Sequence, residues 1–272
     1  MLKDILIPFG FFALIGAILG LMLAFFSKVF RIKSDPKVDE LLEALPGANC
    51  GGCGYAGCQA LAEAIAKGEA RTNACTAGGK ATAQKVADVM GVPFAGITEM
   101  KSFVICGGCD SATKKKFIYE GLNDCISASK LGGGDKECIY GCLGLGSCVR
   151  ACKFDAICIV DGIAVINRDK CTGCGVCVAT CPKKVIKMIP TDSTYVVTCS
   201  SKDKPANVRA VCNVGCISCR ICEKKCEFDA VHVKDNLAII DPVACTNCGK
   251  CAEACPRKII YNILEDKETA PK

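Results

Sequence analysis

The spacing of the cysteines constrains this chain more than any other feature of its sequence. There are 26 cysteines among 272 residues, with a single histidine. Two runs read C-x2-C-x2-C-x3-C-P, namely Cys171, Cys174, Cys177, Cys181 and Pro182, and then Cys245, Cys248, Cys251, Cys255 and Pro256. In such a run three thiolates hold one iron–sulfur cluster and the fourth holds the partner cluster of a two-cluster module. Structural zinc sites usually take two close pairs separated by a longer loop, so these runs favour iron–sulfur clusters.

A repeat organises the second half of the chain. Its cysteines recur at a constant offset of 74 residues, as from Cys171 to Cys245. The other matched pairs are Cys125 with Cys199, Cys138 with Cys212, Cys142 with Cys216, Cys148 with Cys222, Cys152 with Cys226, Cys174 with Cys248, Cys177 with Cys251 and Cys181 with Cys255. The repeat predicts two compact modules, at 125–190 and 199–264.

The spacing assigns ligands within each module. In the second, one cluster takes Cys216, Cys219, Cys222 and Cys255, and the other takes Cys226, Cys245, Cys248 and Cys251. In the first, one cluster takes Cys152, Cys171, Cys174 and Cys177. Leu145 stands where the second module has Cys219, so we expect the other cluster to use Cys138, Cys142, Cys148 and Cys181. A three-iron cluster or a non-cysteine ligand is the alternative at this site.

An earlier cysteine group lies in a glycine-rich segment, which we predict to be a small helical domain at 36–80. Its members are Cys50, Cys53, Cys58 and Cys75, and residues 59–70 between them have the composition of a helix. The layout suggests one further [4Fe-4S] cluster, and zinc remains an alternative on spacing alone.

Six cysteines remain after these five clusters. We hypothesise a sixth cluster with Cys106, Cys125, Cys199 and Cys212 as ligands and Cys109 as an alternative ligand. Cys158 is expected to be a small buried apolar side chain. Residues 81–124 are interpreted as a linker that carries extra cysteines.

Short strand pairs are predicted after each second-cluster cysteine. Residues 154–167 and 228–240 alternate apolar positions around the dipeptides Asp161-Gly162 and Asp235-Asn236, which are typical of tight hairpin turns. The predicted fold class is therefore α+β: one amino-terminal transmembrane helix, a small α-helical [4Fe-4S] domain and two tandem bacterial-type 2[4Fe-4S] ferredoxin modules.

The amino-terminal segment 1–33 is predicted to anchor the chain in a membrane. Ile5 to Phe26 are 22 residues without a charge, long enough to cross a hydrocarbon core of about 30 Å. A cleaved signal peptide is the alternative, but its apolar region would be shorter. Lys28, Arg31 and Lys33 follow the segment, so the positive-inside rule places the rest of the chain on the cytoplasmic side of the cell (inner) membrane. Thiols in a reducing cytoplasm are expected to bind metal rather than form disulfides.

Charge excludes some functions. The net charge of +6 is mildly basic and aromatic residues are few, which does not indicate a nucleic-acid-binding protein. Lys114, Lys115 and Lys116 form a short basic run, which we interpret either as a solvated loop or as a docking patch for an acidic protein. The tail at 265–272 is expected to be disordered.

The chain resembles a known family in these motifs. A membrane helix, the segment LPGANCGGCGYAGCQALAEAI, the segment CLGLGSCVRACKFDAI and two ferredoxin units together resemble the B subunit of the Rnf complex in its long, clostridial-type form. The Rnf complex is an ion-translocating ferredoxin:NAD oxidoreductase. Leu145 departs from the ligand pattern and puts that one cluster in doubt.

The resemblance implies an electron-relay subunit of a membrane-bound translocase, which takes electrons from reduced soluble ferredoxin through [4Fe-4S] clusters. Flavin, NAD and the Na⁺ or H⁺ that moves would belong to other membrane and flavin- or NAD-binding subunits. Neither a dinucleotide-binding glycine fingerprint nor a P-loop is present in the sequence, and no side chain is expected to act as a catalytic acid or base. A free-standing, membrane-anchored polyferredoxin that serves another oxidoreductase is the alternative.

Overall fold

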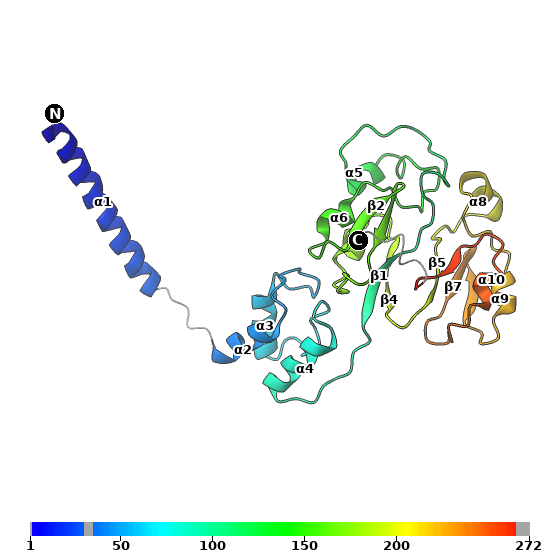
Figure 1. Ribbon diagram of the computed structural model, residues 1–272, viewed down its shortest axis with the longest axis horizontal. Coiled ribbons are helices and arrows are strands. Elements are labelled where there is room, and N and C mark those ends of the chain that lie inside the picture. Colours follow the sequence, from blue (N-terminus) through cyan, green and yellow to red (C-terminus); the bar gives the residue numbers. More distant parts are fainter. Residues whose placement is uncertain (1, 30–34, 265–272) are drawn as a thin grey trace.

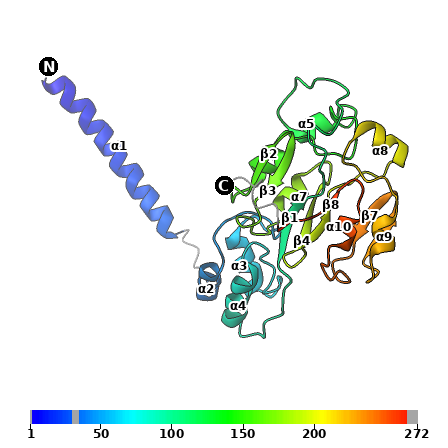
Figure 2. The same ribbon diagram turned by 45° about the vertical axis from the view of Figure 1, so that its right-hand side comes forward.

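A computed structural model of the chain describes residues 2–29 and 35–264. It places a long helix, a helical domain and two small α/β modules in succession (Figures 1 and 2). The predicted disordered tail at 265–272 and the end of the predicted anchor lie outside the described residues.

The first helix, α1 (Leu2–Val29), carries the long apolar stretch of the chain. Its stretch Phe9–Lys28 has a mean hydropathy of 2.5 and none of it is buried. Large apolar side chains such as Phe12 and Leu23 are 70 % and 72 % exposed. A helix of this length and composition is suited to the interior of a membrane, as the sequence predicts.

Three helices form the small domain that follows. They are α2 (Pro36–Ala44), α3 (Cys58–Ala66) and α4 (Gly79–Met90). The Asp35 side chain caps α2 by accepting a hydrogen bond from the amide of Lys37. Apolar side chains from all three helices, including Leu41, Leu61 and Val86, form the core. Because α4 completes this core, the domain extends beyond residue 80, where the sequence predicts its end.

The helix predicted at 59–70 is shorter than expected. α3 ends at Ala66, and Gly68 follows in the left-handed conformation with φ 76°. The amide of Glu69 then donates back to the carbonyl of Ala64, which closes the helix end. The left-handed conformation of Gly68 therefore ends the helix, although the residues that follow it have good helix propensity.

The predicted linker at 81–124 does not behave as a linker. Its first part is α4, and its next part is strand β1 (Met100–Val104), which pairs antiparallel with β4 (Ile186–Pro190) at the end of the first module. The register joins Met100 to Pro190 and Val104 to Ile186. The segment thus ties the helical domain to the first module.

The two modules are built alike. The first contains α5 (Cys125–Ser129), α6 (Ser147–Ala151), β2 (Ile157–Val160), β3 (Ile163–Ile166), α7 (Val176–Thr180) and β4. The second contains β5 (Tyr195–Val197), α8 (Pro205–Val211), α9 (Ile221–Lys225), β6 (Val231–Lys234), β7 (Leu237–Ile240), α10 (Lys250–Glu253) and β8 (Ile260–Asn262).

Each module has two small antiparallel sheets, β1–β4 with β2–β3 in the first and β5–β8 with β6–β7 in the second. The two predicted hairpins are confirmed as β2–β3 and β6–β7. All four turn residues, Asp161, Gly162, Asp235 and Asn236, have positive φ, as the two-residue hairpin turn requires. The strands surround cores in which buried cysteines lie among valine, isoleucine and alanine side chains.

Replacement of Leu61 by alanine tests the core of the helical domain. Leu61 is 1 % exposed, and truncation of such a side chain costs about 2–5 kcal/mol. Leu61→Ala should therefore accelerate amide hydrogen exchange across α2, α3 and α4 in the intact protein. Val243→Ala, at a position 93 % exposed, should leave exchange in that domain unchanged. Equal exchange in both variants would contradict the described core.

Candidate iron–sulfur sites

Loops of one conformation surround the clustered thiols. In both C-x2-C-x2-C-x3-C-P runs the residues on either side of the second cysteine have positive φ: Gly173 and Gly175 in the first, Asn247 and Gly249 in the second. Ser218 and Arg220 around Cys219 share this conformation. Successive backbone N–H groups in such turns form a concave surface suited to an anion. A negatively charged, thiolate-bound cluster fits this cradle.

The predicted thiol sets of the second module come together. Burial, together with the nearby thiols of Cys216, Cys255 and Cys219, raises the pKa of Cys222 to about 11. These four thiols line one small cavity. Burial also raises the pKa of Cys251, with added contributions from Cys245, Cys226 and Cys248.

One predicted set of the first module comes together in the same way. Burial raises the pKa of Cys177, and the thiols of Cys171, Cys174 and Cys152 raise it further. Thiolates in such a desolvated group repel one another, and iron would offset that repulsion.

The four cysteines of the helical domain also converge. Burial raises the pKa of Cys75, to which Cys53, Cys58 and Cys50 add. Asn49, with φ 45°, directs its side-chain oxygen to the amide of Cys58 at 2.8 Å. This contact fixes the loop against the start of α3.

The loop around Leu145 keeps the cradle without the central cysteine. Gly144 and Gly146 have φ of 72° and 73°, like their counterparts in the other loops. Burial raises the pKa of Cys148 to about 12, followed by contributions from Cys142, Cys125 and Cys181. Cys125 packs with Leu143 and beside Leu145. The structure therefore brings Cys125, rather than the predicted Cys138, to the gap left at Leu145.

Hydrogen bonds fix Cys125 at this place. The backbone amide of Cys125 donates to the hydroxyl of Ser147 at 2.8 Å, and that hydroxyl donates to Asp124 at 2.7 Å. Asp124 also caps α5 by accepting from the amide of Ser127. The first residues of α5 and α6 are thereby joined, which holds the Cys125 thiol beside the Leu145 loop.

Cys138 belongs to a different group. Burial raises its pKa, and the thiol that contributes most is Cys212. Cys138, Cys106, Cys199 and Cys212 line one cavity between the two modules. Cys138 thus stands in this cavity where the hypothesised sixth set has Cys125.

The two halves of this group are structurally equivalent. Cys106 follows β1 and Cys199 follows β5, each two residues beyond the strand. The amide of Cys142 donates to the Cys106 sulfur at 3.4 Å, and the amide of Cys216 donates to the Cys199 sulfur at 3.3 Å. The structural equivalent of Cys199 is thus Cys106. The offset of 74 residues between Cys125 and Cys199 is a coincidence.

Neighbouring thiol sets lie beside one another along the molecule. Cys50 is the first thiol among those that raise the pKa of Cys174, so the set of the helical domain adjoins the first module. Cys177 contributes likewise to the raised pKa of Cys148. The amide contacts from Cys142 to Cys106 and from Cys216 to Cys199 continue the series into the second module.

Close packing maintains the first of these junctions. A Cβ atom at Gly52 would lie 2.2 Å from the carbonyl oxygen of Cys174, and the hydroxyl of Thr76 donates to the same oxygen at 3.4 Å. Only glycine allows the two loops to approach this closely.

Two cysteines stay outside all six groups. Cys109 contacts the hydroxyl of Ser111 at 3.1 Å. Cys158 lies on β2 and is only partly buried, whereas the sequence predicts a buried side chain.

The basic run has intramolecular partners. Lys115 pairs with Asp110 at 3.1 Å and with Asp135 at 3.6 Å, and the Lys116 ammonium donates to the carbonyl of Gly132. These contacts hold the side chains of Lys115 and Lys116 against the chain between β1 and α5.

Three family models match the chain. The model described as "Putative Fe-S cluster" covers residues 45–77, which include all four cysteines of the helical domain. The "4Fe-4S binding domain" model covers 164–187 and the "4Fe-4S dicluster domain" model covers 215–260. The iron–sulfur interpretation is favoured over zinc at each matched segment.

Curated relatives align over most of the chain. The B subunit of the Na⁺-translocating ferredoxin:NAD⁺ oxidoreductase complex of Acetobacterium woodii is 42% identical over 99% of this chain and 82% of its own length. The B subunit of an ion-translocating oxidoreductase complex of Methanosarcina acetivorans is 43% identical over 90% of this chain and 94% of its own. The B subunit of the proton-translocating ferredoxin:NAD⁺ oxidoreductase complex of Clostridium ljungdahlii is 43% identical over 92% and 90%.

Fold and sites together define an iron–sulfur electron-transfer protein with ferredoxin-type domains and one apolar helix suited to anchoring it. The chain belongs to the B subunits of the Rnf complex, the membrane-bound, ion-translocating ferredoxin:NAD⁺ oxidoreductase. The resemblance seen in its motifs is confirmed. The relatives differ in the ion that their names give, so membership of the family does not fix the ion.

Gly52→Ala tests the junction between the helical domain and the first module. The backbone of Gly52 is outside the left-handed region, so the added methyl group acts through its clash with Cys174 alone. Overpacking of this kind costs about 1–3 kcal/mol, and we expect amide exchange around Thr76 and Cys174 to accelerate by roughly tenfold or more. Iron content should not change. The matched control is Gly96→Ala, where the added atom meets open space; the same acceleration in both variants would refute the contact.

Proposed function

We propose that the chain holds six [4Fe-4S] clusters. Five of the ligand sets are Cys50, Cys53, Cys58, Cys75; Cys152, Cys171, Cys174, Cys177; Cys125, Cys142, Cys148, Cys181; Cys216, Cys219, Cys222, Cys255; and Cys226, Cys245, Cys248, Cys251. The sixth set is Cys106, Cys138, Cys199 and Cys212. The convergence of four thiols in each group supports these sets, and the left-handed cradles around several of them support their occupation by clusters.

The observation that carries the proposed role is the continuity of the thiol sets. They follow one another from the helical domain, which comes after the membrane segment, through the first module and into the second. A [4Fe-4S] cluster accepts and releases single electrons at a potential set by hydrogen bonds, charge and exposure. The side chains of this protein hold the clusters, exclude water from them and set their surroundings, and none needs to act as an acid or base.

We infer that soluble ferredoxin donates electrons to the chain, and that the other membrane and flavin- or NAD-binding subunits of the complex accept them. The names of the A. woodii and C. ljungdahlii relatives support ferredoxin and NAD⁺ as the substrates of the assembled complex. Cys219 and Cys248 are the exposed cysteines of the described residues, and both lie in the second module. That module is therefore the accessible end of the series.

We also infer the orientation of the chain in the cell (inner) membrane. α1 would cross the bilayer once, and the charges Lys28, Arg31 and Lys33 that follow its apolar stretch favour the cytoplasmic side for everything after it. The cysteine-rich domains would then face the compartment in which soluble ferredoxin is found.

Iron analysis of paired cysteine variants tests the ligand sets. Six clusters correspond to about 24 iron atoms per chain in anaerobically prepared protein. Cys125→Ser with Cys148→Ser removes two ligands of one proposed cluster, so the double variant should lose about four iron atoms. Cys138→Ser with Cys148→Ser removes ligands of two clusters and should lose about eight.

Cys109→Ser with Cys158→Ser is the control and should retain the full iron content, because neither thiol lies in a proposed set. If instead the Cys138 and Cys148 pair lost only about four iron atoms and the Cys125 and Cys148 pair about eight, the ligand set expected from the sequence would be restored.

Reduction by ferredoxin tests the proposed role. The full-length chain in detergent or nanodiscs, with its clusters loaded, should be bleached in the visible range by chemically reduced two-cluster ferredoxin. NADH alone should not bleach it, because the sequence carries no dinucleotide fingerprint. Rapid reduction by NADH without any other subunit would overturn the assignment of NAD chemistry to partner subunits.

A further inference from the structure

One lysine is buried inside the iron–sulfur region. The Lys136 side chain is 1 % exposed, the lowest exposure of any charged group among the described residues. Its ammonium donates to the carbonyl oxygens of Gly108 and Gly162, each at 2.9 Å, and lies 3.4 Å from an Asp110 carboxylate oxygen. Three acceptors therefore surround a group that has three N–H donors. This coordination is suited to the charged form.

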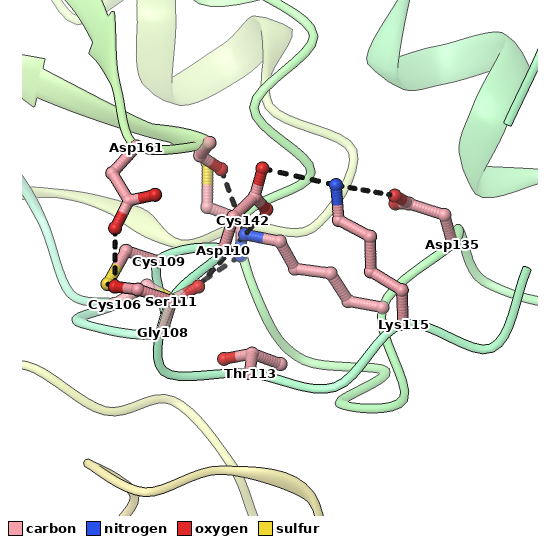
Figure 3. Close-up of polar contacts among 12 residues, drawn as sticks. Cys106, Gly108, Cys109, Asp110, Ser111, Thr113, Lys115, Asp135, Cys142 and Asp161 are labelled. Carbon is pink, nitrogen blue, oxygen red and sulfur yellow. Dashed lines mark hydrogen bonds and ion pairs between the residues drawn. The ribbon is translucent and has the colours of Figure 1, made fainter. Parts of the chain in front are cut away.

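Lys136 lies at the junction of two proposed clusters. It is two residues before Cys138, and Gly108, which accepts its hydrogen bond, is two residues after Cys106. The amide of Cys142 contacts the Cys106 sulfur at 3.4 Å, so the two ligand sets meet here (Figure 3). The positive charge of Lys136 lowers the pKa of both Cys106 and Cys142, against the larger, opposite effect of burial.

The carboxylate that pairs with Lys136 does not cancel this charge. The Asp110 side chain is 38 % exposed and is shared with Lys115, whose ammonium lies 3.1 Å from its second oxygen. Solvent screens the charge of Asp110 far more than that of Lys136. The electrostatic potential inside the junction is consequently dominated by the buried ammonium of Lys136 rather than by the carboxylate of Asp110.

The second module has no lysine at the position equivalent to Lys136. At the offset of 74 residues that relates Cys138 to Cys212, the position of Lys136 is occupied by Ala210. Asp203 stands four residues after Cys199, as Asp110 does after Cys106, so the acidic residue is repeated and the lysine is not. On the side of the second module the nearest cation is the partly buried Arg257, whose guanidinium donates to the carbonyl of Cys212 at 2.6 Å. Among the described residues, only the Lys136 side of the shared site therefore carries a fully buried charge.

We propose that Lys136 raises the reduction potentials of the two clusters that meet at this junction, those of Cys125, Cys142, Cys148, Cys181 and of Cys106, Cys138, Cys199, Cys212. A fixed positive charge stabilises the added electron of a reduced cluster, and low surrounding polarity increases its effect. The junction is thereby made a preferred position for electrons between the two modules. This inference rests on the ligand sets proposed above.

Redox titration of the intact, cluster-loaded chain followed by EPR tests the proposal. In Lys136→Gln the side chain still donates hydrogen bonds but carries no charge, and two of the midpoint potentials should become more negative. We expect roughly a tenfold change in the ratio of oxidised to reduced cluster, which is about 59 mV for a one-electron couple. The remaining midpoints should not move.

Asp110→Asn provides the opposite change, because it removes the negative partner and leaves the lysine in place. The same two midpoints should become more positive, by less than the change in Lys136→Gln. Lys115→Met is the control for an exposed cation in the same network and should shift the midpoints least.

The iron content of the protein distinguishes a failure of this proposal from a failure of the ligand sets on which it rests. Fewer clusters in the unaltered chain would refute the ligand sets. A full complement of clusters with unchanged midpoints in Lys136→Gln, or shifts of the same sign in Lys136→Gln and Asp110→Asn, would refute the role of Lys136. Should Lys136→Gln lose iron, the sign of the shift in Asp110→Asn alone decides the question.

Discussion

The physical constraint on which this structure depends is the gathering of buried thiols that would repel one another once ionised. Burial raises the pKa of Cys148 and of Cys106 to about 12, so iron must replace protons for these groups to carry charge near neutral pH. The core of each module combines such buried cysteines with valine, isoleucine and alanine side chains. Domains of this size bury too little apolar surface to be secure by themselves, and we regard the clusters as part of their cores. Short helices and two-stranded sheets suffice because they only need to hold loops in place.

Backbone conformation, rather than secondary structure, defines the sites. The pair of left-handed residues around each central cysteine is built with glycine at Gly173 and Gly175, but with Ser218 and Arg220 in the second module. Non-glycine residues adopt this conformation at some cost in free energy, which the bound cluster would offset. The Leu145 loop retains the conformation through Gly144 and Gly146 although it has no thiol at its centre. A cradle and a ligand are thus separable, and in the proposed ligand sets Cys125 of α5 supplies the missing thiolate.

Much of this arrangement could be predicted from the sequence, and the failures have physical causes. The runs at Cys171 and Cys245 carry fixed local geometry, so their ligands and the hairpins at Asp161 and Asp235 follow from spacing. The exchange of Cys125 and Cys138 could not be predicted that way. Residues 107–137 separate Cys106 from Cys138, whereas only 200–211 separate Cys199 from Cys212. The longer segment moves Cys125 to an offset of 74 from Cys199 by chance. The hydrogen bond from the amide of Cys142 to the Cys106 sulfur cannot be read from the sequence. It shows that Cys106, rather than Cys125, is the structural equivalent of Cys199.

The cavity shared by Cys106, Cys138, Cys199 and Cys212 has a consequence for folding. Each module contributes half of it, and neither half has enough thiols to hold a cluster alone. Once filled, the site would act as a cross-link that closes a loop of more than a hundred residues, from Cys106 to Cys212. Closing so long a loop removes much conformational freedom from the unfolded chain. The two modules would then unfold as one cooperative unit, and oxidative loss of that single cluster would leave backbone hydrogen bonds such as the one from Gly107 to Thr198 to hold them together.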